Sequence, residues 1–224
     1  MGSTSTTIYS RAQPSLQGHG LFLSPFTPAD VPAMLVGDRD PETARRLGWA
    51  PEDPSAEKAQ AYVAQCAERW RNADRVPWAV REQEQSIALG HVELNMGNER
   101  RARVSFSTYP PARGRGLAAR AVDLVCVFAF DELCIARVQL LTDADNLASR
   151  AVAAKAGFAI EGILRDYAER GGKRHDTVLH SRLSTDPPPN FDPLAPLDRS
   201  QPTAGDGGPS TPQSRWPAKA KRTR

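Results

Sequence analysis

Two glycines between arginines stand where an alternating segment gives way to a helical one. Residues 103 to 109 alternate between polar and apolar, two prolines end that pattern, and Arg113, Gly114, Arg115 and Gly116 follow. Glycine lets a backbone approach a ligand closely, and the first amides of a helix lack intrahelical partners. These amides, the helix dipole and two guanidinium groups all attract anions. The turn is therefore predicted to hold a phosphorylated ligand, for example through a diphosphate.

The same glycines also fit a dinucleotide-binding fingerprint. Gly114, Gly116 and Ala119 have its spacing, and Asp143 ends the next predicted strand, where an acid that binds ribose belongs. However, five residues including two prolines separate the preceding strand from the turn, and too few units follow Asp143 to complete a doubly wound sheet. NAD(P) binding stays as the weaker alternative. A Walker phosphate loop is excluded, because no Gly-Lys-Ser/Thr follows at the required spacing.

Hydrophobic periodicity predicts a mixed α/β fold around this turn. A helix begins near Pro28, and others cover about 55–71, 116–133 and 146–157; strands are expected over 21–26, 78–81, 87–94, 104–108, 137–142, 158–164 and 177–183. The helix at 116–133 is a crossover, so the strands that flank it are predicted to be parallel and the others antiparallel.

One domain, residues 19–184, accounts for this pattern. Residues 1–18 are polar and aperiodic, and residues 185–224 hold nine of the 19 prolines, so both ends are predicted to be disordered. The formal net charge of +3 leaves the domain nearly neutral, which disfavours nucleic acid as a partner. A signal peptide, a membrane span and paired cysteines at metal-ligand spacing are not found, so we expect a cytoplasmic protein without a metal.

Two polar positions elsewhere are candidates for the site. On the strand at 90–95, His91, Glu93 and Asn95 share one face. That face fits the lining of a substrate cleft, with Glu93 as a proton acceptor, and fits an ordinary solvent-facing sheet surface equally well. Asn146 opens a predicted helix, where its side chain is expected to cap a backbone amide.

Five short motifs occur together along residues 20–184. They are Leu23 to Asp30 (LSPFTPAD), Arg113-x-x-Gly116-x-Ala118, Asn146 to Ser149 (NLAS), Lys155 to Phe158 (KAGF) and Glu161 to Arg165 (EGILR). In these motifs and in the order of its elements, the chain resembles the GNAT superfamily of N-acetyltransferases. The resemblance is to the branch of ribosomal-protein acetyltransferases such as RimJ and RimL.

The resemblance implies a GNAT fold, with a mostly antiparallel central sheet, one splayed parallel strand pair and helices on both faces. Acetyl-CoA would lie between strands 103–109 and 137–142, and no metal would be needed. The implied cofactor contacts are Thr108, Tyr109, Arg113, Gly114, Arg115, Gly116, Leu117, Ala118, Asn146 and Ser149.

The resemblance also implies direct transfer of the acetyl group to a primary amine in a ternary complex. Ser149 or Tyr167 would serve the departing thiolate as acid, and Glu93 would accept the proton of the amine. Glu169 is an alternative base, and Ala168 stands where some relatives carry a carboxylate. A protein N-terminus and a small-molecule amine both remain open as acceptors, and homodimers are common among relatives. The alternative function is a catalytically silent acyl-CoA-binding module.

Overall fold

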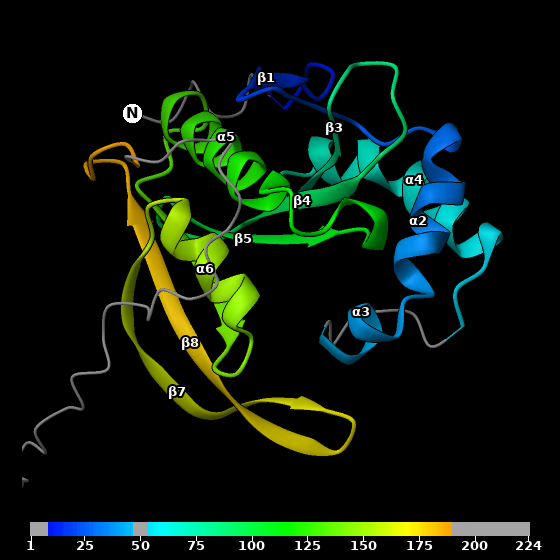
Figure 1. Cartoon of the computed structure of the whole chain (residues 1–224). Helices are drawn as coiled ribbons and strands as arrows, with labels where there is room; N and C mark the ends of the chain where they lie inside the picture. Colours follow the sequence, from blue (N-terminus) through cyan, green and yellow to red (C-terminus); the bar gives the residue numbers. More distant parts are fainter. Residues whose placement is uncertain (1–8, 47–52, 190–224) are drawn as a thin grey trace, which may run out of the picture.

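The computed structural model describes residues 9–46 and 53–189, which form one eight-stranded sheet with helices packed on it (Figure 1). The strands lie in the order β1-β2-β3-β4-β5-β6-β8-β7. They are β1 (Leu16–Gly18), β2 (Leu21–Ser24), β3 (Arg75–Arg81), β4 (Gly90–Met96), β5 (Arg101–Thr108), β6 (Arg137–Asp143), β7 (Ala159–Arg170) and β8 (Lys173–Leu183). The helices are α2 (Val31–Asp38), α3 (Pro41–Arg46), α4 (Ala56–Arg71), α5 (Leu117–Asp131) and α6 (Leu147–Lys155), with 3-10 turns η1 (Pro28–Asp30) and η2 (Pro110–Ala112).

The parallel pair predicted around the crossover helix is β5 and β6. Every other pairing in the sheet is antiparallel. The two parallel strands share only three rungs, from Arg101 opposite Arg137 to Arg103 opposite Gln139, and then diverge. The mixed sheet with one splayed parallel pair is therefore confirmed.

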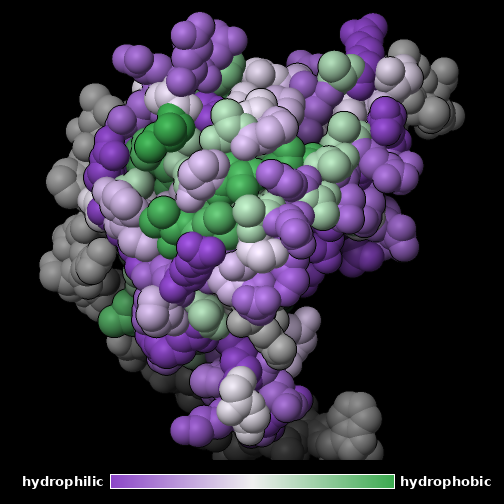
Figure 2. Space-filling model, turned by 90° about the vertical axis from the view of Figure 1, so that its right-hand side faces the viewer, coloured by the Kyte–Doolittle hydropathy of each residue, from purple (hydrophilic) through white to green (hydrophobic). Residues whose placement is uncertain are grey.

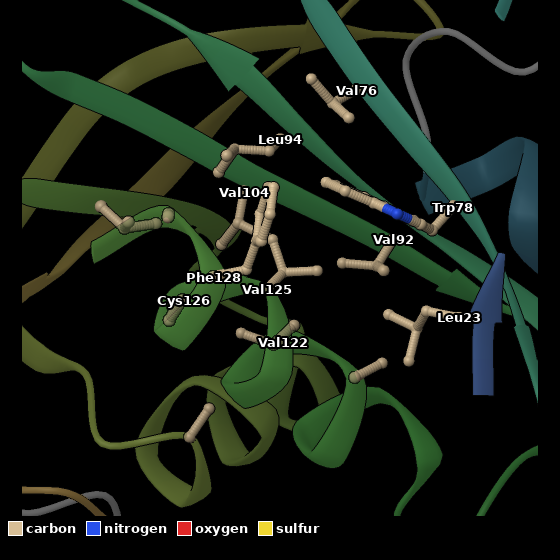
Figure 3. Close-up of a cluster of buried hydrophobic side chains, with 14 of the residues drawn as sticks. Leu23, Val76, Trp78, Val92, Leu94, Val104, Val122, Val125, Cys126 and Phe128 are labelled. Carbon is tan, nitrogen blue, oxygen red and sulfur yellow. The ribbon is translucent and has the colours of Figure 1, made fainter. Parts of the chain in front are cut away.

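Each face of the sheet has its own hydrophobic core, because alternate side chains of one strand point to opposite faces. Trp78, Val92 and Leu94 pack with Val125 and Phe128 of α5 on one face (Figure 3). Burying an apolar side chain of this size contributes about 1.5–3 kcal/mol. On the same face Cys126 is fully buried, and burial raises the pKa of its thiol to about 12, so this cysteine acts as a small core residue.

The opposite face carries the second core, under α2 and α4. Ala79 of β3 packs there with Phe26, Met34 and Tyr109. Helices therefore cover both faces, as predicted. Seen from the side where α2 and α4 lie, apolar side chains gather at the middle of the surface, within a hydrophilic surround (Figure 2).

Buried ion pairs connect elements that are distant in sequence. Asp123 of α5 accepts from Arg182 of β8 at 2.6 Å and lies 2.7 Å from Nε2 of His19. The Asp123 and Arg182 side chains are only 7% and 4% exposed. Arg81 of β3 likewise donates to Asp30 at 2.7 Å. These contacts fix α5 and the start of α2 against the sheet.

The prediction of a disordered segment over residues 1–18 is wrong for residues 9–18. β1 pairs with β2, and the Tyr9 ring lies 4.9 Å from that of Trp70. The indoles of Trp70 and Trp78 donate to the carbonyls of Arg11 and Pro14 at 2.7 and 2.8 Å. Hydrogen-bond donors far along the chain order this segment, so its own sequence shows no periodic pattern. The expectations for residues 1–8 and 190–224 lie outside the described residues.

Candidate active site

A cavity of about 650 Å³ opens where β5 and β6 diverge. The cavity is lined by residues of both strands beyond their last shared rung, together with residues of α2, α4 and α6. Five of the residues proposed from the sequence meet on this cavity: Glu93, Tyr109, Asn146, Ser149 and Tyr167. The divergence of one strand pair thus gathers candidates from four separate segments.

The glycine turn has the backbone that its sequence predicts. Gly116 precedes α5 with φ at 71°, and Gly114 has φ at 78°, both in the left-handed region that favours glycine. The amides of Leu117 and Ala118 therefore stand at the start of a helix, with its dipole behind them. The turn lies outside the cavity lining, at the adjoining end of the splayed strands.

Both arginines of the turn are engaged by carboxylates. Arg113 donates to Asp40 and, at 2.9 Å, to the Thr43 hydroxyl, while Arg115 donates to Glu82. The hydrogen bond from Arg113 holds the pKa of Asp40 below its ordinary value. A diphosphate that uses these guanidinium groups must therefore replace carboxylates that already bind them.

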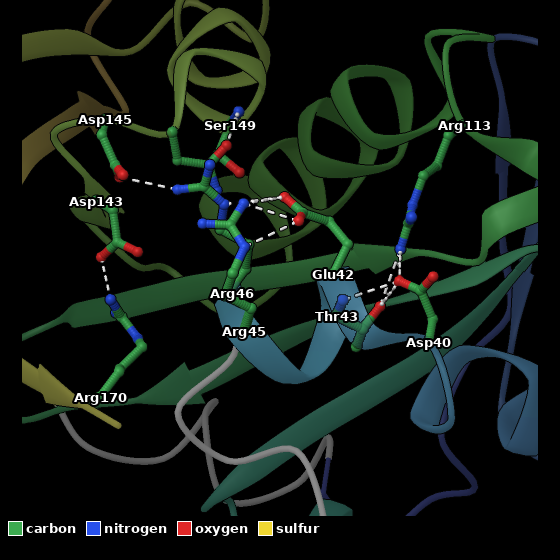
Figure 4. A network of polar contacts seen from close by, with 11 residues as sticks. Asp40, Glu42, Thr43, Arg45, Arg46, Arg113, Asp143, Asp145, Ser149 and Arg170 are labelled. Atoms are coloured by element: carbon green, nitrogen blue, oxygen red, sulfur yellow. Dashed lines mark hydrogen bonds and ion pairs between the residues drawn. The ribbon is translucent and has the colours of Figure 1, made fainter. Parts of the chain in front are cut away.

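The short helix α3 spans the opening between the two sides of the splay (Figure 4). At one end Asp40 and Thr43 hold Arg113, and at the other Arg46 donates to Asp145 at 2.8 Å. This helix was not predicted, because six residues are too few for a periodic signal.

Asn146 is the N-cap of α6, as predicted, with its Oδ1 accepting from the Ser149 amide at 3.1 Å. Ser149 lies one turn into the helix and faces the cavity. None of the other described residues hydrogen-bonds its hydroxyl, which leaves that group available to a ligand.

Tyr167 reaches the cavity from an irregular part of β7. The register between β7 and β8 shifts between Leu164 and Ala168, and Asp166 adopts a positive φ of 52°. The Asp166 amide donates to Asp176 at 2.9 Å, which supports the bulge. A bulge turns a side chain away from the regular alternation, and here it directs a tyrosine that is 54% exposed toward the site.

Glu93 faces inward, so the cleft interpretation of its strand is the one that the structure supports. Its side chain is only 10% exposed and accepts from the Tyr62 hydroxyl at 3.4 Å. Guanidinium groups of Arg75 and Arg69 lie 3.7 and 4.0 Å from its oxygens. Burial, with the nearby Glu93 charge, raises the pKa of Tyr62, which keeps that hydroxyl protonated.

Thr108 and Tyr109, proposed as backbone contacts, have partners within the protein. The Tyr109 amide donates to the Leu89 carbonyl at 2.9 Å, and the Thr108 carbonyl accepts from Arg113 at 3.3 Å. The Tyr109 amide is therefore not a free donor, and its ring packs in the second core. That packing needs a glycine opposite, since a Cβ on Gly37 would lie 2.4 Å from the ring.

Two features of the cavity were missed from the sequence. Asp38, at the end of α2, lines it, and burial raises the pKa of this carboxyl. The second is a group of arginines beside Glu93. His91, which shares the face of Glu93 as expected, also lines the cavity, and burial lowers its pKa to about 4, so the ring is neutral at pH 7. Asp38 falls in a region without a readable motif, so only the folded arrangement reveals it.

Two kinds of feature are absent from the described residues. No group of three or more His, Cys, Asp or Glu side chains among residues 9–46 and 53–189 is placed to hold a metal ion. Within the same ranges, none of the helices has both the length and the apolar character that crossing a bilayer needs.

The sheet opens around a cavity lined by a carboxylate, a serine and a tyrosine, beside an anion-attracting turn, and this arrangement suits acyl transfer from a phosphorylated donor. The single parallel pair rules out the doubly wound sheet that the dinucleotide alternative required. Residues 20–159 match the family model described as acetyltransferase (GNAT) domain, and the chain belongs to this family.

Known proteins agree with this assignment. The uncharacterized N-acetyltransferase YoaA of Bacillus subtilis is 25% identical over 170 residues, which cover 75% of this chain and 96% of YoaA. RimJ of Mycobacterium smegmatis, solved with CoA-disulfide, shares the fold with a TM-score of 0.67 at 19% identity, over 76% of this chain and 86% of RimJ. RimL, a ribosomal L7/L12 alpha-N-protein acetyltransferase solved with coenzyme A, shares the fold with a TM-score of 0.68 at 19% identity. The match covers 76% of this chain and 98% of RimL.

Proposed function

We propose that the protein transfers the acetyl group of acetyl-CoA to a primary amine by direct attack in a ternary complex. The observation that carries this proposal is the cavity between the diverging strands, which gathers acid and base candidates beside an anion-attracting turn. The family assignment and the CoA complexes of RimJ and RimL support the choice of donor.

The residues of the turn suit the diphosphate of the cofactor. Gly114 and Gly116 let the backbone come close, and the amides of Leu117 and Ala118 point from a helix start. Arg113 and Arg115 add charge once their carboxylate partners give way. The pantetheine then runs along the edge of β5 that faces the splay, near Thr108, toward Asn146 and Ser149.

The transfer needs a proton acceptor, a polarised carbonyl and a stabilised thiolate. A neutral amine attacks the thioester carbon, the C–S bond breaks, and the sulfur takes the electron pair. Unpaired amides of β5 on the splayed side would polarise the carbonyl oxygen. The Ser149 hydroxyl stabilises the thiolate, with Tyr167 as a second donor of a proton. Glu93 accepts the proton that leaves the amine, directly or through water.

Asp38 is a second candidate for the base. Its pKa is raised by burial, and a base whose pKa lies closer to neutrality transfers protons more efficiently at neutral pH. Glu93→Gln and Asp38→Asn separate the two, because loss of a general base lowers kcat by about a hundredfold or more. The variant with the larger loss of kcat, and a lost acidic limb of its pH profile, identifies the base.

The acceptor is an amine of a protein N-terminus or of a small molecule. RimL is a ribosomal L7/L12 alpha-N-protein acetyltransferase, which favours a protein N-terminus, while the cavity itself admits a small amine.

The decisive experiment measures release of free CoA thiol from acetyl-CoA with a panel of peptides and small amines. Turnover with any of these amines supports the proposed enzyme. Binding of CoA by calorimetry without turnover across the whole panel would instead indicate the silent acyl-CoA-binding module.

A further inference from the structure

Two arginines flank Asn95 in a row across three neighbouring strands. Asn95 of β4 is opposite Arg75 of β3 on one side and Arg103 of β5 on the other. Directly opposed residues of antiparallel strands present their side chains on the same face, about 5 Å apart. All three residues line the cavity. The row thus places two guanidinium groups at one end of the site, on either side of an amide.

The adjacent row contains Glu93, opposite Ser105 of β5. Glu93 lies 3.7 Å from Arg75 and 4.0 Å from Arg69, whereas charge-assisted hydrogen bonds are about 2.7–2.9 Å long. The two guanidinium groups therefore keep donors that Glu93 does not use. Arg103 has no carboxylate within ion-pair distance among residues 9–46 and 53–189.

Apart from the carboxyl group of Asp38, the other charged groups at the cavity are paired already. Arg170 donates to Asp143, and Arg46 donates to Asp145 at 2.8 Å. Lys58 lies 3.8 Å from Asp53. The surplus of positive charge is therefore local to Arg69, Arg75 and Arg103, and it stands beside the carboxylate proposed to receive the amine.

We propose that the acceptor carries a carboxylate close to its reacting amine, and that Arg75 and Arg103 bind this carboxylate while the amine lies at Glu93. The inference rests on the proposed acetyl transfer and names its substrate class. The rows are about 7 Å apart along the backbone, and the Arg75 guanidinium group lies 3.7 Å from Glu93. A carboxylate bound in this row would therefore stand within one residue of an amine at Glu93. A free amino acid and a protein N-terminus with an acidic residue in its first positions share this chemistry.

Matched pairs of amines test the proposal, each pair differing only in the carboxylate. Alanine is compared with alaninamide, and peptides that begin Ala-Glu-Glu are compared with peptides that begin Ala-Gln-Gln. The measured quantity is kcat/KM for thiol release, referred to the neutral amine present at the assay pH. We expect the anionic member of one pair to be preferred roughly tenfold or more. The pair that shows the preference identifies whether the carboxylate belongs to a free amino acid or to an acidic protein N-terminus.

Arginine variants connect the preference to the row. Arg103→Gln and Arg75→Gln are expected to reduce the preference at least threefold. Arg101→Gln is the matched control, because Arg101 lies on the same face of β5, is exposed and is outside the cavity. It should keep the wild-type preference. Equal rates within both pairs, or equal preferences in Arg103→Gln and Arg101→Gln, would overturn the inference while turnover itself still supported the enzyme.

Binding measured without turnover separates the two proposals. The probes are N-acetylalanine and an N-acetylated Ala-Glu-Glu peptide, titrated by calorimetry into the CoA complex beside their amides. Selective binding that Arg103→Gln removes would support the carboxylate site even if no amine were acetylated, in which case only the proposed reaction would fail. Absence of selective binding and of selective turnover would refute the carboxylate site.

Discussion

Replacing Asp40 by asparagine should tighten CoA binding. In the structure Arg113 donates to Asp40 and Thr43, so a diphosphate that binds Arg113 competes with a carboxylate. Asp40 also accepts from the Thr43 amide at 2.8 Å and thereby caps α3. Asparagine can keep that cap through its own side-chain oxygen, so Asp40→Asn removes the charge and retains the helix start.

The size of the effect follows from the exposure of the pair. The Arg113 side chain is 36% exposed and that of Asp40 is 16% exposed, so solvent screens their attraction. Pairs of this kind contribute about 0–1 kcal/mol, which corresponds to a CoA dissociation constant lowered by up to about fivefold. Arg113→Ala removes the ligand contact itself, so that the competition with Asp40 no longer matters, and should raise the dissociation constant about tenfold or more.

Calorimetric titration with CoA at low and moderate salt measures both changes. The double variant is the sharpest control, because the gain from Asp40→Asn must disappear when Arg113 is absent. Unchanged or weaker CoA binding in Asp40→Asn would refute the competition. An Arg113→Ala variant with wild-type affinity would remove Arg113 from the cofactor site.

Three further predictions concern stability. Asp123→Ala leaves Arg182 buried without its partner and should lower the free energy of unfolding by about 3–5 kcal/mol in urea, whereas the exposed Arg45→Ala should cost less than about 0.5 kcal/mol; similar losses would contradict the role of burial. Asn146→Ala should cost about 1 kcal/mol while Asn146→Asp retains the cap, and a fall in CoA affinity in both variants would separate a cofactor contact from capping. Hydrogen bonds from Arg137 and Ser181 lower the pKa of Glu161 to about 2, so the stability that this carboxylate contributes is complete above pH 4.5 and is lost as the pH falls toward 2. Because the Arg137–Glu161 pair is partly exposed, Glu161→Gln should reduce this loss of stability at low pH by only about 1 kcal/mol or less. An unchanged loss of stability at low pH in Glu161→Gln would exclude the pair as its cause.

Short sequence patterns predicted those parts of the site whose structure depends only on neighbouring residues. The left-handed glycines, the start of α5 and the cap at Asn146 each follow from residue type and short-range geometry, and the structure has them. The crossover between β5 and β6 followed from the helix between them.

The remainder depends on contacts between distant residues. Asp40 and Arg113 lie far apart in the sequence, and none of the motifs in the chain indicates that a short helix bridges them. Tyr167 reaches the cavity only because of a register shift in β7. The Arg75–Asn95–Arg103 row exists only once the register of three strands is fixed, so its charge could not be read from any single segment.

The early end of pairing between β5 and β6 leaves the sheet one strand short along the edge from Val104 to Thr108. A pantetheine arm in that gap would act as a temporary strand and complete the hydrogen bonding of the edge. Amide hydrogens there should exchange with solvent faster in the free protein than in its CoA complex. At a CoA concentration one hundred times the dissociation constant, occupancy would add about 2.7 kcal/mol to the stability of the whole domain. The free energy of unfolding would then depend on the concentration of CoA around the protein.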